Sequence, residues 1–197
     1  MQGWRSRLHD SSLTEKGVAD MLTENGEHLY VHHEEYQRLI ERLALQIHDS
    51  GWQFATIICL ARGGLRPGDI LSRLFRVPLA ILAVSSYRDD DGTTQGELHM
   101  STAISTTLPA LIGPVLLVDD LTDSGQTLHA VTNMLRERHP AITELRTAVI
   151  WTKGISSRRP DYAAQHLPTS PWIHQPFEIY DKLSLQDLQQ KNAKQDL

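Results

Sequence analysis

The sequence predicts an α/β fold in which a twisted, mostly parallel sheet is flanked by helices. Short, almost continuously apolar runs alternate along the chain with segments of helical period, a pattern typical of strands buried between helices on both faces of a sheet. The chain has 197 residues, of which 40% are hydrophobic and 22% charged, the composition of an ordinary globular domain. At about 150 residues per domain, this length predicts one core with additions rather than two full domains.

Apolar runs mark the predicted strands, which lie at residues 29–31, 54–60, 79–84, 115–118 and 145–151. Apolar residues at helical spacing predict helices at residues 34–50, 65–75 and 126–137. Gly51 is placed to end the first helix. Pro67 is tolerated in the first turn of the second, because the N–H that proline lacks would have no helical partner there.

Two stretches interrupt the alternation. Residues 87–107 are polar without a core pattern, and an excursion of this kind in a compact domain is often a functional lid. Residues 152–181 contain several prolines and the aromatic residues Trp172 and Phe177, which predicts an irregular flap. We therefore divide the chain into an N-terminal extension (1–28), a core (29–151), a hood (152–183) and a polar C-terminal tail (184–197).

Charge and cysteine content exclude several functional classes. The formal net charge is −5, so no overall basic field would attract nucleic acid or an anionic membrane. The apolar runs are shorter than the roughly 18 residues of a membrane span, and we see no signal peptide. Cys59 is the only cysteine, which excludes an intramolecular disulfide and predicts a buried, inert thiol. We expect a cytoplasmic protein.

The segment Val115–Thr127, VLLVDDLTDSGQT, carries the clearest chemistry. It predicts a buried strand, then carboxylates, a small polar loop and a helix. Gly125 lets the backbone approach a ligand, Ser124 and Thr127 offer hydroxyls, and the helix start offers N–H groups and the positive end of its dipole. The loop is not a Walker motif, because Gln126 stands where that motif needs lysine.

Three carboxylates beside a phosphate loop need another role, because they would repel the phosphate. Asp119 and Asp120 can accept hydrogen bonds from a ribose diol, and Mg²⁺ at the same oxygens would offset their charge. These residues predict a ribose-phosphate site. The alternative is a helix N-cap whose acidic residues favour the helix dipole.

The same segment resembles the phosphoribosyl-pyrophosphate (PRPP) signature of type I phosphoribosyltransferases. Residues 59–72, CLARGGLRPGDILS, resemble the pyrophosphate loop and following helix of bacterial xanthine-guanine (6-oxopurine) phosphoribosyltransferases. Ser85–Tyr87 is similar to the start of that family's mobile catalytic loop, and residues 152–154 and 171–178 resemble its purine-binding flap. The resemblance covers about residues 29–181 and implies the type I phosphoribosyltransferase fold with a small C-terminal hood.

The resemblance implies a role for each matched residue. Asp119 and Asp120 would hold the ribose hydroxyls and, partly through ligand and water, Mg²⁺. Asp123 would be the general base near the purine N7 or would simply hydrogen-bond the base. The 5′-phosphate would be bound by Thr122, Asp123, Ser124, Gly125, Gln126 and Thr127. Pyrophosphate would be bound by Ala61, Arg62, Gly63 and Gly64, with a cis peptide at Ala61–Arg62.

For the base, the resemblance implies that Lys153 donates to the purine O6 and that Trp172 stacks on the ring, with Ile173 and Glu178 beside it. Ser86, Tyr87 and the loop behind them would close over PRPP and exclude water. The structural alternatives are a surface charge for Arg62 and a packed flap anchor for Trp172.

The chain also departs from the xanthine-guanine enzymes. Glu178 stands where they carry aspartate, and His174 stands where they carry glutamate. The choice among guanine, xanthine and hypoxanthine therefore stays open.

The resemblance implies an Mg²⁺-dependent pentosyltransferase of purine salvage, which transfers 5-phosphoribosyl from PRPP to a purine and releases pyrophosphate. It implies a homodimer or homotetramer, and we expect neither a membrane nor a nucleic acid as partner. One alternative is a non-catalytic PRPP-sensing regulator that binds nucleic acid through Arg38, Arg42 and Arg158–Arg159. Another is a transferase for a pyrimidine or different acceptor, against which Lys153 and Trp172 argue.

Overall fold

The computed structural model describes residues 22–88, 95–154 and 159–193. Contacts divide the chain into two compact units, which we describe separately. The core unit comprises residues 37–170, and the hood unit comprises residues 1–36 and 171–197. These two units have other bounds than the core (29–151) and hood (152–183) named from the sequence. Much of the N-terminal extension therefore lies outside the described residues.

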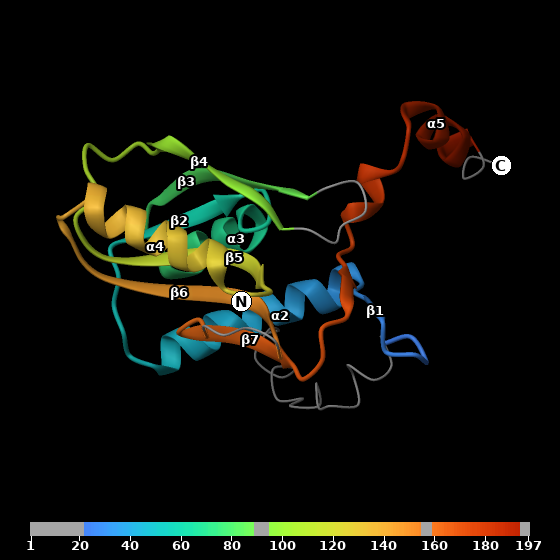
Figure 1. The fold of residues 1–197 in the computed structure, drawn as a ribbon, viewed down its shortest axis with the longest axis horizontal. Helices are drawn as coiled ribbons and strands as arrows, with labels where there is room; N and C mark the ends of the chain where they lie inside the picture. The colour runs from blue at the N-terminus through green and yellow to red at the C-terminus, as the bar shows by residue number, and fades with distance from the viewer. Residues whose placement is uncertain (1–21, 89–94, 155–158, 194–197) are drawn as a thin grey trace, which may run out of the picture. The chain divides into compact units, whose positions relative to one another are not determined.

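A six-stranded sheet forms the centre of the core unit (Figure 1). From edge to edge its strands are β4 (Gln95–Ser105), β3 (Leu79–Arg88), β2 (Thr56–Ala61), β5 (Gly113–Thr122), β6 (Ile142–Lys153) and β7 (Tyr162–Leu167). Neighbouring strands are parallel except β3 and β4, which are antiparallel. The predicted mostly parallel sheet is confirmed.

Helices α3 (Leu65–Phe75) and α4 (Gln126–Arg138) cover opposite faces of this sheet; in Figure 1, α4 lies in front of the strands and α3 behind them. The apolar side of α4 packs into one core cluster with Leu60 of β2. Alternate side chains of a strand point to the other face, where a Cβ added to Gly68 of α3 would lie 2.6 Å from the Cβ of Cys59. Cys59 is fully buried with a free thiol, as expected.

Helix α2 (His33–Asp49) precedes the sheet. Its apolar residues recur at helical spacing and are buried: Leu39, Ile40, Leu43 and Ile47. Gly51 follows the helix with a φ of 70°, and its N–H donates to the His48 carbonyl at 3.0 Å. This confirms the predicted helix end. Among the described helices, none combines the length and hydropathy that a bilayer span requires.

The polar stretch at residues 87–107 differs from its prediction. Residues 95–105 form strand β4, which pairs with an extended β3 that includes Ser86 and Tyr87. Met100 and Ile104 are partly buried against the core cluster. The connection at residues 89–94, which is part of the expected lid, lies outside the described residues, as do the side chains of Ser86 and Tyr87.

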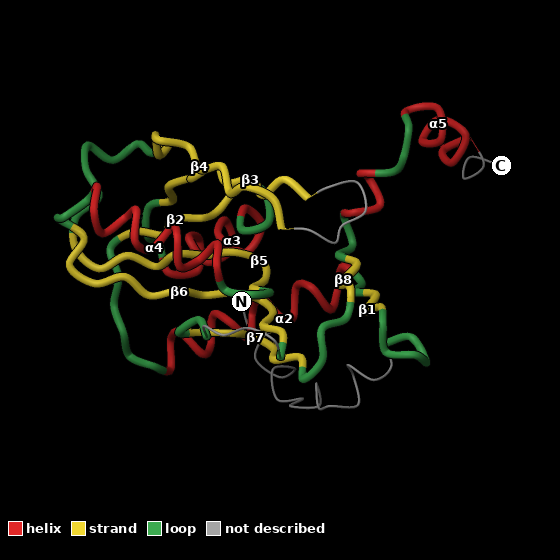
Figure 2. Tube along the Cα trace, viewed as in Figure 1, coloured by secondary structure: helices red, strands yellow, loops and turns green. Residues whose placement is uncertain are grey.

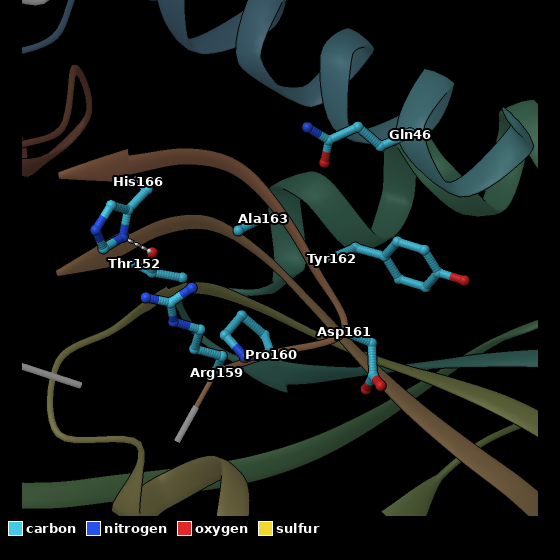
Figure 3. Close-up of a pocket in the computed structure, with 8 residues that line it drawn as sticks. All are labelled: Gln46, Thr152, Arg159, Pro160, Asp161, Tyr162, Ala163 and His166. Atoms are coloured by element: carbon cyan, nitrogen blue, oxygen red, sulfur yellow. Dashed lines mark hydrogen bonds between the residues drawn. The ribbon is translucent and has the colours of Figure 1, made fainter. Parts of the chain in front are cut away.

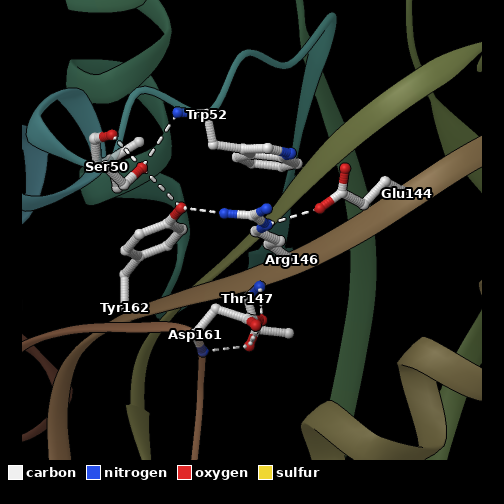
Figure 4. A network of polar contacts seen from close by, with 8 residues as sticks. Ser50, Trp52, Glu144, Arg146, Thr147, Asp161 and Tyr162 are labelled. Atoms are coloured by element: carbon white, nitrogen blue, oxygen red, sulfur yellow. Dashed lines mark hydrogen bonds and ion pairs between the residues drawn. The ribbon is translucent and has the colours of Figure 1, made fainter.

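The predicted irregular flap at residues 152–181 is also more regular than expected. Residues 162–167 form β7, a parallel edge strand of the main sheet. A cluster around Arg146 holds the beginnings of β6 and β7 together (Figure 4). The Arg146 guanidinium donates to the Tyr162 hydroxyl at 2.8 Å and to Glu144 at 2.7 Å, and lies 4.6 Å from the Trp52 ring centroid.

The hood unit contains a separate two-stranded parallel sheet of β1 (His28–Tyr30) and β8 (Trp172–His174). The 3₁₀ helix η1 (Glu178–Asp181) and helix α5 (Leu185–Ala193) follow β8. Leu29 and Ile173 are buried at the centre of this small sheet.

Candidate functional site

The strand order reverses between β2 and β5, which is the position at which open α/β sheets form a ligand-binding crevice. The chain passes from β2 to β3 on one side, and from β5 to β6 on the other. In open α/β sheets, ligands bind outside the carboxyl ends of strands at such a switch point. The loops that leave β2 and β5 are residues 62–64 and 123–125 (green in Figure 2). They lie within the two segments that the sequence singled out, residues 61–64 and 122–127.

The loop after β2 lies in contact with the end of β5. The Ala61–Arg62 peptide bond is cis, as the resemblance implies. A Cβ added to Gly63 would collide with the carboxylate of Asp120, and one added to Gly64 would collide with the backbone carbonyl of Val118. Only residues without a side chain fit this approach, which explains the two glycines.

Asp119 and Asp120 lie near the carboxyl end of β5, and each carboxylate accepts a hydrogen bond from the backbone N–H of the next residue. Asp119 Oδ1 accepts the Asp120 N–H at 3.0 Å, and Asp120 Oδ1 accepts the Leu121 N–H at 2.8 Å. Burial raises the pKa of the Asp119 carboxyl well above its usual range, and the neighbouring Asp120 charge raises this pKa further. The pair thus favours a ligand that brings positive charge or hydroxyl donors.

The donor set of this pair fits Mg²⁺. The described residues contain no group of three or more metal-binding side chains. Mg²⁺ usually takes only one or two protein carboxylates and completes its shell with water and substrate phosphates. Asp119 and Asp120 supply a donor set of this kind.

Helix α4 begins directly after the loop at residues 123–125. Its N-cap is Gly125, which has a φ of 82° and no capping side chain. The alternative in which Asp119 or Asp120 caps the helix is therefore wrong. Ser124 Oγ accepts the Gln126 N–H at 3.4 Å. Thr122 is buried at the end of β5, whereas Asp123, Ser124 and Thr127 are half-buried.

The end of β6 contributes a buried cation. Lys153 Nζ lies 3.5 Å from Asp123 Oδ1, with 9% of the lysine side chain and 36% of the aspartate side chain exposed. Ser170 Oγ donates to the same Asp123 oxygen at 3.4 Å. Sequence reasoning missed Ser170, because nothing near it in the chain marks it as a partner of Asp123.

The structure brings together the predicted pyrophosphate, ribose, phosphate and Lys153 groups within the core unit. The remaining base-binding residues, Trp172, Ile173 and Glu178, belong to the hood unit. Trp172 is 49% exposed and Ile173 is 4% exposed. The exposure of Trp172 argues against the alternative of a packed flap anchor.

A pocket of about 390 Å³ lies at β7 (Figure 3). It contains Thr152, from a segment that resembles the purine-binding flap, and Arg159, which the sequence offered for the alternative nucleic-acid face. Arg159, His166 and Thr152 line it, and the Thr152 hydroxyl lies 2.7 Å from His166 Nδ1.

Comparisons with known proteins agree with this geometry. Residues 29–182 match the family model of the phosphoribosyl transferase domain. The fold is similar to that of a purine phosphoribosyltransferase from Pyrococcus horikoshii Ot3, with 26% identity and a TM-score of 0.62 over 77% of this chain and 93% of that one. It is also similar to a xanthine-guanine-hypoxanthine phosphoribosyltransferase from Helicobacter pylori, with 23% identity and a TM-score of 0.61 over 85% and 99% of the respective chains. A hypoxanthine phosphoribosyltransferase from Trypanosoma cruzi matches with 26% identity and a TM-score of 0.53 over 70% and 75% of the respective chains.

Proposed function

We propose, from the premise that this chain belongs to the phosphoribosyl transferase domain family, that it transfers 5-phosphoribosyl from PRPP to a 6-oxopurine in purine salvage. The acceptor is guanine, xanthine or hypoxanthine. The observation that carries the proposal is the contact between the Gly63–Gly64 loop and the Asp120 carboxylate. This contact supports the proposal, because it brings the loop proposed for pyrophosphate against the carboxylate proposed for the ribose.

The two ends of PRPP match different groups at the switch point between β2 and β5. Arg62 suits pyrophosphate, because a guanidinium offers a planar fork of donors. Ser124, Thr127 and the start of α4 suit the 5′-phosphate. Asp119 and Asp120 suit the ribose hydroxyls and Mg²⁺. Bound Mg²⁺ would neutralise charge on the leaving pyrophosphate.

The purine preference is supported by Lys153 and by the similarity to a purine and to a hypoxanthine phosphoribosyltransferase. A buried ammonium can donate to a 6-oxo group, whereas a 6-amino group offers it no acceptor. Trp172 offers a half-exposed ring for stacking, an interaction worth about 1–3 kcal/mol per base.

In the proposed reaction, a purine nitrogen bonds to the anomeric carbon as the bond from that carbon to pyrophosphate breaks. The configuration inverts, and the transition state resembles an oxocarbenium ion. The proton displaced from the purine passes to Asp123 or to solvent. The protein mainly positions the reactants and stabilises charge.

The test measures pyrophosphate release from PRPP with a panel of purine and pyrimidine bases, with and without Mg²⁺. We expect release with 6-oxopurines and Mg²⁺. Release with pyrimidines alone would favour the transferase for a different acceptor. Silence across the panel, with salt-sensitive binding of nucleic acid, would favour the regulator.

We expect the variant Asp120→Asn to lower kcat/KM for PRPP by about 10- to 100-fold, because it weakens charged hydrogen bonds to the ribose. Its melting temperature should stay close to that of the parent protein. Asp69→Asn is the matched control, because Asp69 pairs with Arg73 on the exposed surface of α3. Unchanged PRPP kinetics in Asp120→Asn would refute the assignment.

We also propose a homodimer or homotetramer in the cytoplasm, on the resemblance stated above. Light scattering coupled to size-exclusion chromatography tests the assembly, and a monomer would contradict it.

A further inference from the structure

Two histidines face each other across the small sheet of the hood unit. His28 Nδ1 on β1 lies 3.0 Å from His174 Nε2 on β8. Their ring centroids are 5.1 Å apart. Tyr30 stacks on His174 with a centroid separation of 4.3 Å and an interplanar angle of 6°. The contact therefore joins residues 146 positions apart in the chain.

The histidine contact lies on the strand that carries the proposed base-binding residues. In the parallel register, His28 stands opposite Trp172, and Tyr30 stands opposite His174. The Trp172 N–H donates to the Glu27 carbonyl at 2.8 Å, and the Val31 N–H donates to the His174 carbonyl at 3.0 Å. Strand β1 thus holds β8 by backbone hydrogen bonds, and the histidine pair adds a side-chain hydrogen bond between the two strands.

The number of protons on the pair decides whether this bond exists. A neutral pair can form it, because one ring nitrogen carries a hydrogen and the other accepts. A singly protonated pair keeps it, since the neutral ring still accepts. When both rings are protonated, both facing nitrogens carry hydrogens and two like charges lie 3.0 Å apart. The bond is then replaced by repulsion.

The surroundings of His174 oppose the second proton. Burial lowers the pKa of His174 below its usual value, and the charges of His28 on β1 and Lys182 after η1 lower this pKa further. A lowered pKa in the folded state means that the contribution of the pair is complete above about pH 6.5 and is lost as the pH falls through the folded pKa.

We propose that the His28–His174 hydrogen bond positions the base-binding strand β8, and that double protonation of this pair in acid weakens binding of the base. His28 and His174 are positioning residues, because they act through Trp172 and Ile173. The inference rests on the proposed function only where it takes β8 as the base-binding strand.

The activity test compares KM for the base and KM for PRPP between pH 7 and pH 5. Between pH 7 and pH 5, we expect KM for the base to increase in the parent protein by a factor about fivefold larger than in His28→Gln. A factor of this size is typical of one hydrogen bond. Glutamine can accept from protonated His174 but adds no second charge, so it removes the acid step. His28→Ala should have a raised KM for the base already at pH 7. His48→Gln, at the end of α2 in the core unit, is the matched control and should follow the parent profile.

A second measurement is independent of activity and separates this proposal from the proposed function. Histidine ring resonances are titrated by NMR, with His174 assigned from His174→Gln, and amide exchange is followed at Val31 and Trp172. We expect the pKa of His174 to rise in His28→Gln. We also expect exchange at both amides, corrected for intrinsic rates, to accelerate in acid only in the parent protein. Identical titration and exchange in parent and His28→Gln would overturn the proposal, whether or not the protein turns over a base. Identical base-KM profiles in an active enzyme would also overturn it.

Discussion

Gly63 and Gly64 show how single residues define the site. Each glycine leaves space that a Cβ would fill, but the two neighbours differ in kind. The neighbour of Gly63 is the side chain of Asp120, whereas the neighbour of Gly64 is the backbone of Val118 and Leu60. A side chain can be removed by mutation and a backbone cannot, so the two contacts can be separated experimentally.

We expect Gly63→Ala to lower the free energy of unfolding by roughly 1–3 kcal/mol, the usual range for overpacking. In an Asp120→Ala background, this cost should fall clearly, because the colliding carboxylate is gone. Gly64→Ala is the control, and its cost should be similar in both backgrounds. Urea denaturation of the single and double variants gives the coupling energy. Equal costs of Gly63→Ala in both backgrounds would contradict the contact.

The Lys153–Asp123 pair predicts an asymmetry between its two partners. Lys153 is nearly buried, whereas Asp123 keeps about a third of its side chain exposed. Removing the aspartate leaves a buried ammonium without its carboxylate, whereas removing the lysine leaves a carboxylate that water can reach.

We expect Asp123→Ala to destabilise the protein by roughly 1–3 kcal/mol, and Lys153→Met by less than about 1 kcal/mol, because methionine fills similar apolar space. Both variants should lose turnover of 6-oxopurines. Thermal denaturation beside the base panel measures both effects. If Lys153→Met proves less stable than Asp123→Ala, the Lys153 ammonium does not depend on Asp123 in the way that the burial of the lysine indicates.

At the scale of elements, sequence prediction succeeded where both faces of a strand are buried. Strands β2 and β5 have cores of consecutive buried residues, as in Ile57–Leu60, so their apolar runs stand out. Gly63 in the loop after β2 and Asp120 at the end of β5 stand directly beside these runs in the sequence. The edge strands β4 and β7 were missed because each presents part of its length to solvent.

The missed strands left weaker signals. Leu98, Met100 and Ile104 alternate with polar residues along β4, the period-two pattern of a half-buried strand. Strand β7 lies in the proline-free stretch between Pro160 and Pro168. The pairing of β1 with β8 had no local signal at all, since it joins distant segments and depends on how the ends of the chain fold together.

The Arg146 cluster explains how β7 is held without long apolar runs. Arg146 joins Tyr162 at the start of β7 to Glu144 and Trp52, and the Tyr162 hydroxyl lies 2.9 Å from Ser50 Oγ. Arginine suits this place, because its planar guanidinium stacks on a ring while its edge donates hydrogen bonds.

We expect Arg146→Met to lower the melting temperature by a few degrees, and Arg146→Lys to recover only part of that loss, because an ammonium lacks the planar fork. The control is Arg73→Met, which removes an exposed pair with Asp69 on α3 and should change little. Differential scanning fluorimetry measures all three. Equal shifts in Arg146→Met and Arg73→Met would show that the cluster is only a surface feature.

At the scale of the whole molecule, the distribution of charge differs from its total. The net charge of −5 indicates no attraction for anions. Three of the acidic residues, Asp119, Asp120 and Asp123, nevertheless lie beside the loops that suit phosphate groups. The proposed base-binding groups are divided between the core unit, with Lys153, and the hood unit, with Trp172. The hood unit itself is built from both ends of the chain, so residues near β1 matter to β8.

Global stability should report on the buried thiol at the centre of the sheet. Burial, followed by the charges of Asp119 and Asp69, raises the pKa of the Cys59 thiol to about 11. The unfolded chain releases this proton near pH 9 and the folded chain does not, so the folded state loses stability as the pH rises through this interval. Between pH 8 and pH 10, the parent protein should lose about 1 kcal/mol more than Cys59→Ala, which has no thiol to titrate. Urea denaturation of the metal-free proteins at both pH values measures this difference. The contributions of lysines and tyrosines cancel in the comparison, because these residues titrate in both proteins. If parent and variant lose the same stability, the fold does not hold the thiol neutral. The packing of Gly68 on Cys59 would then have to be looser than the structure indicates, in which a Cβ added to Gly68 would lie 2.6 Å from the Cβ of Cys59.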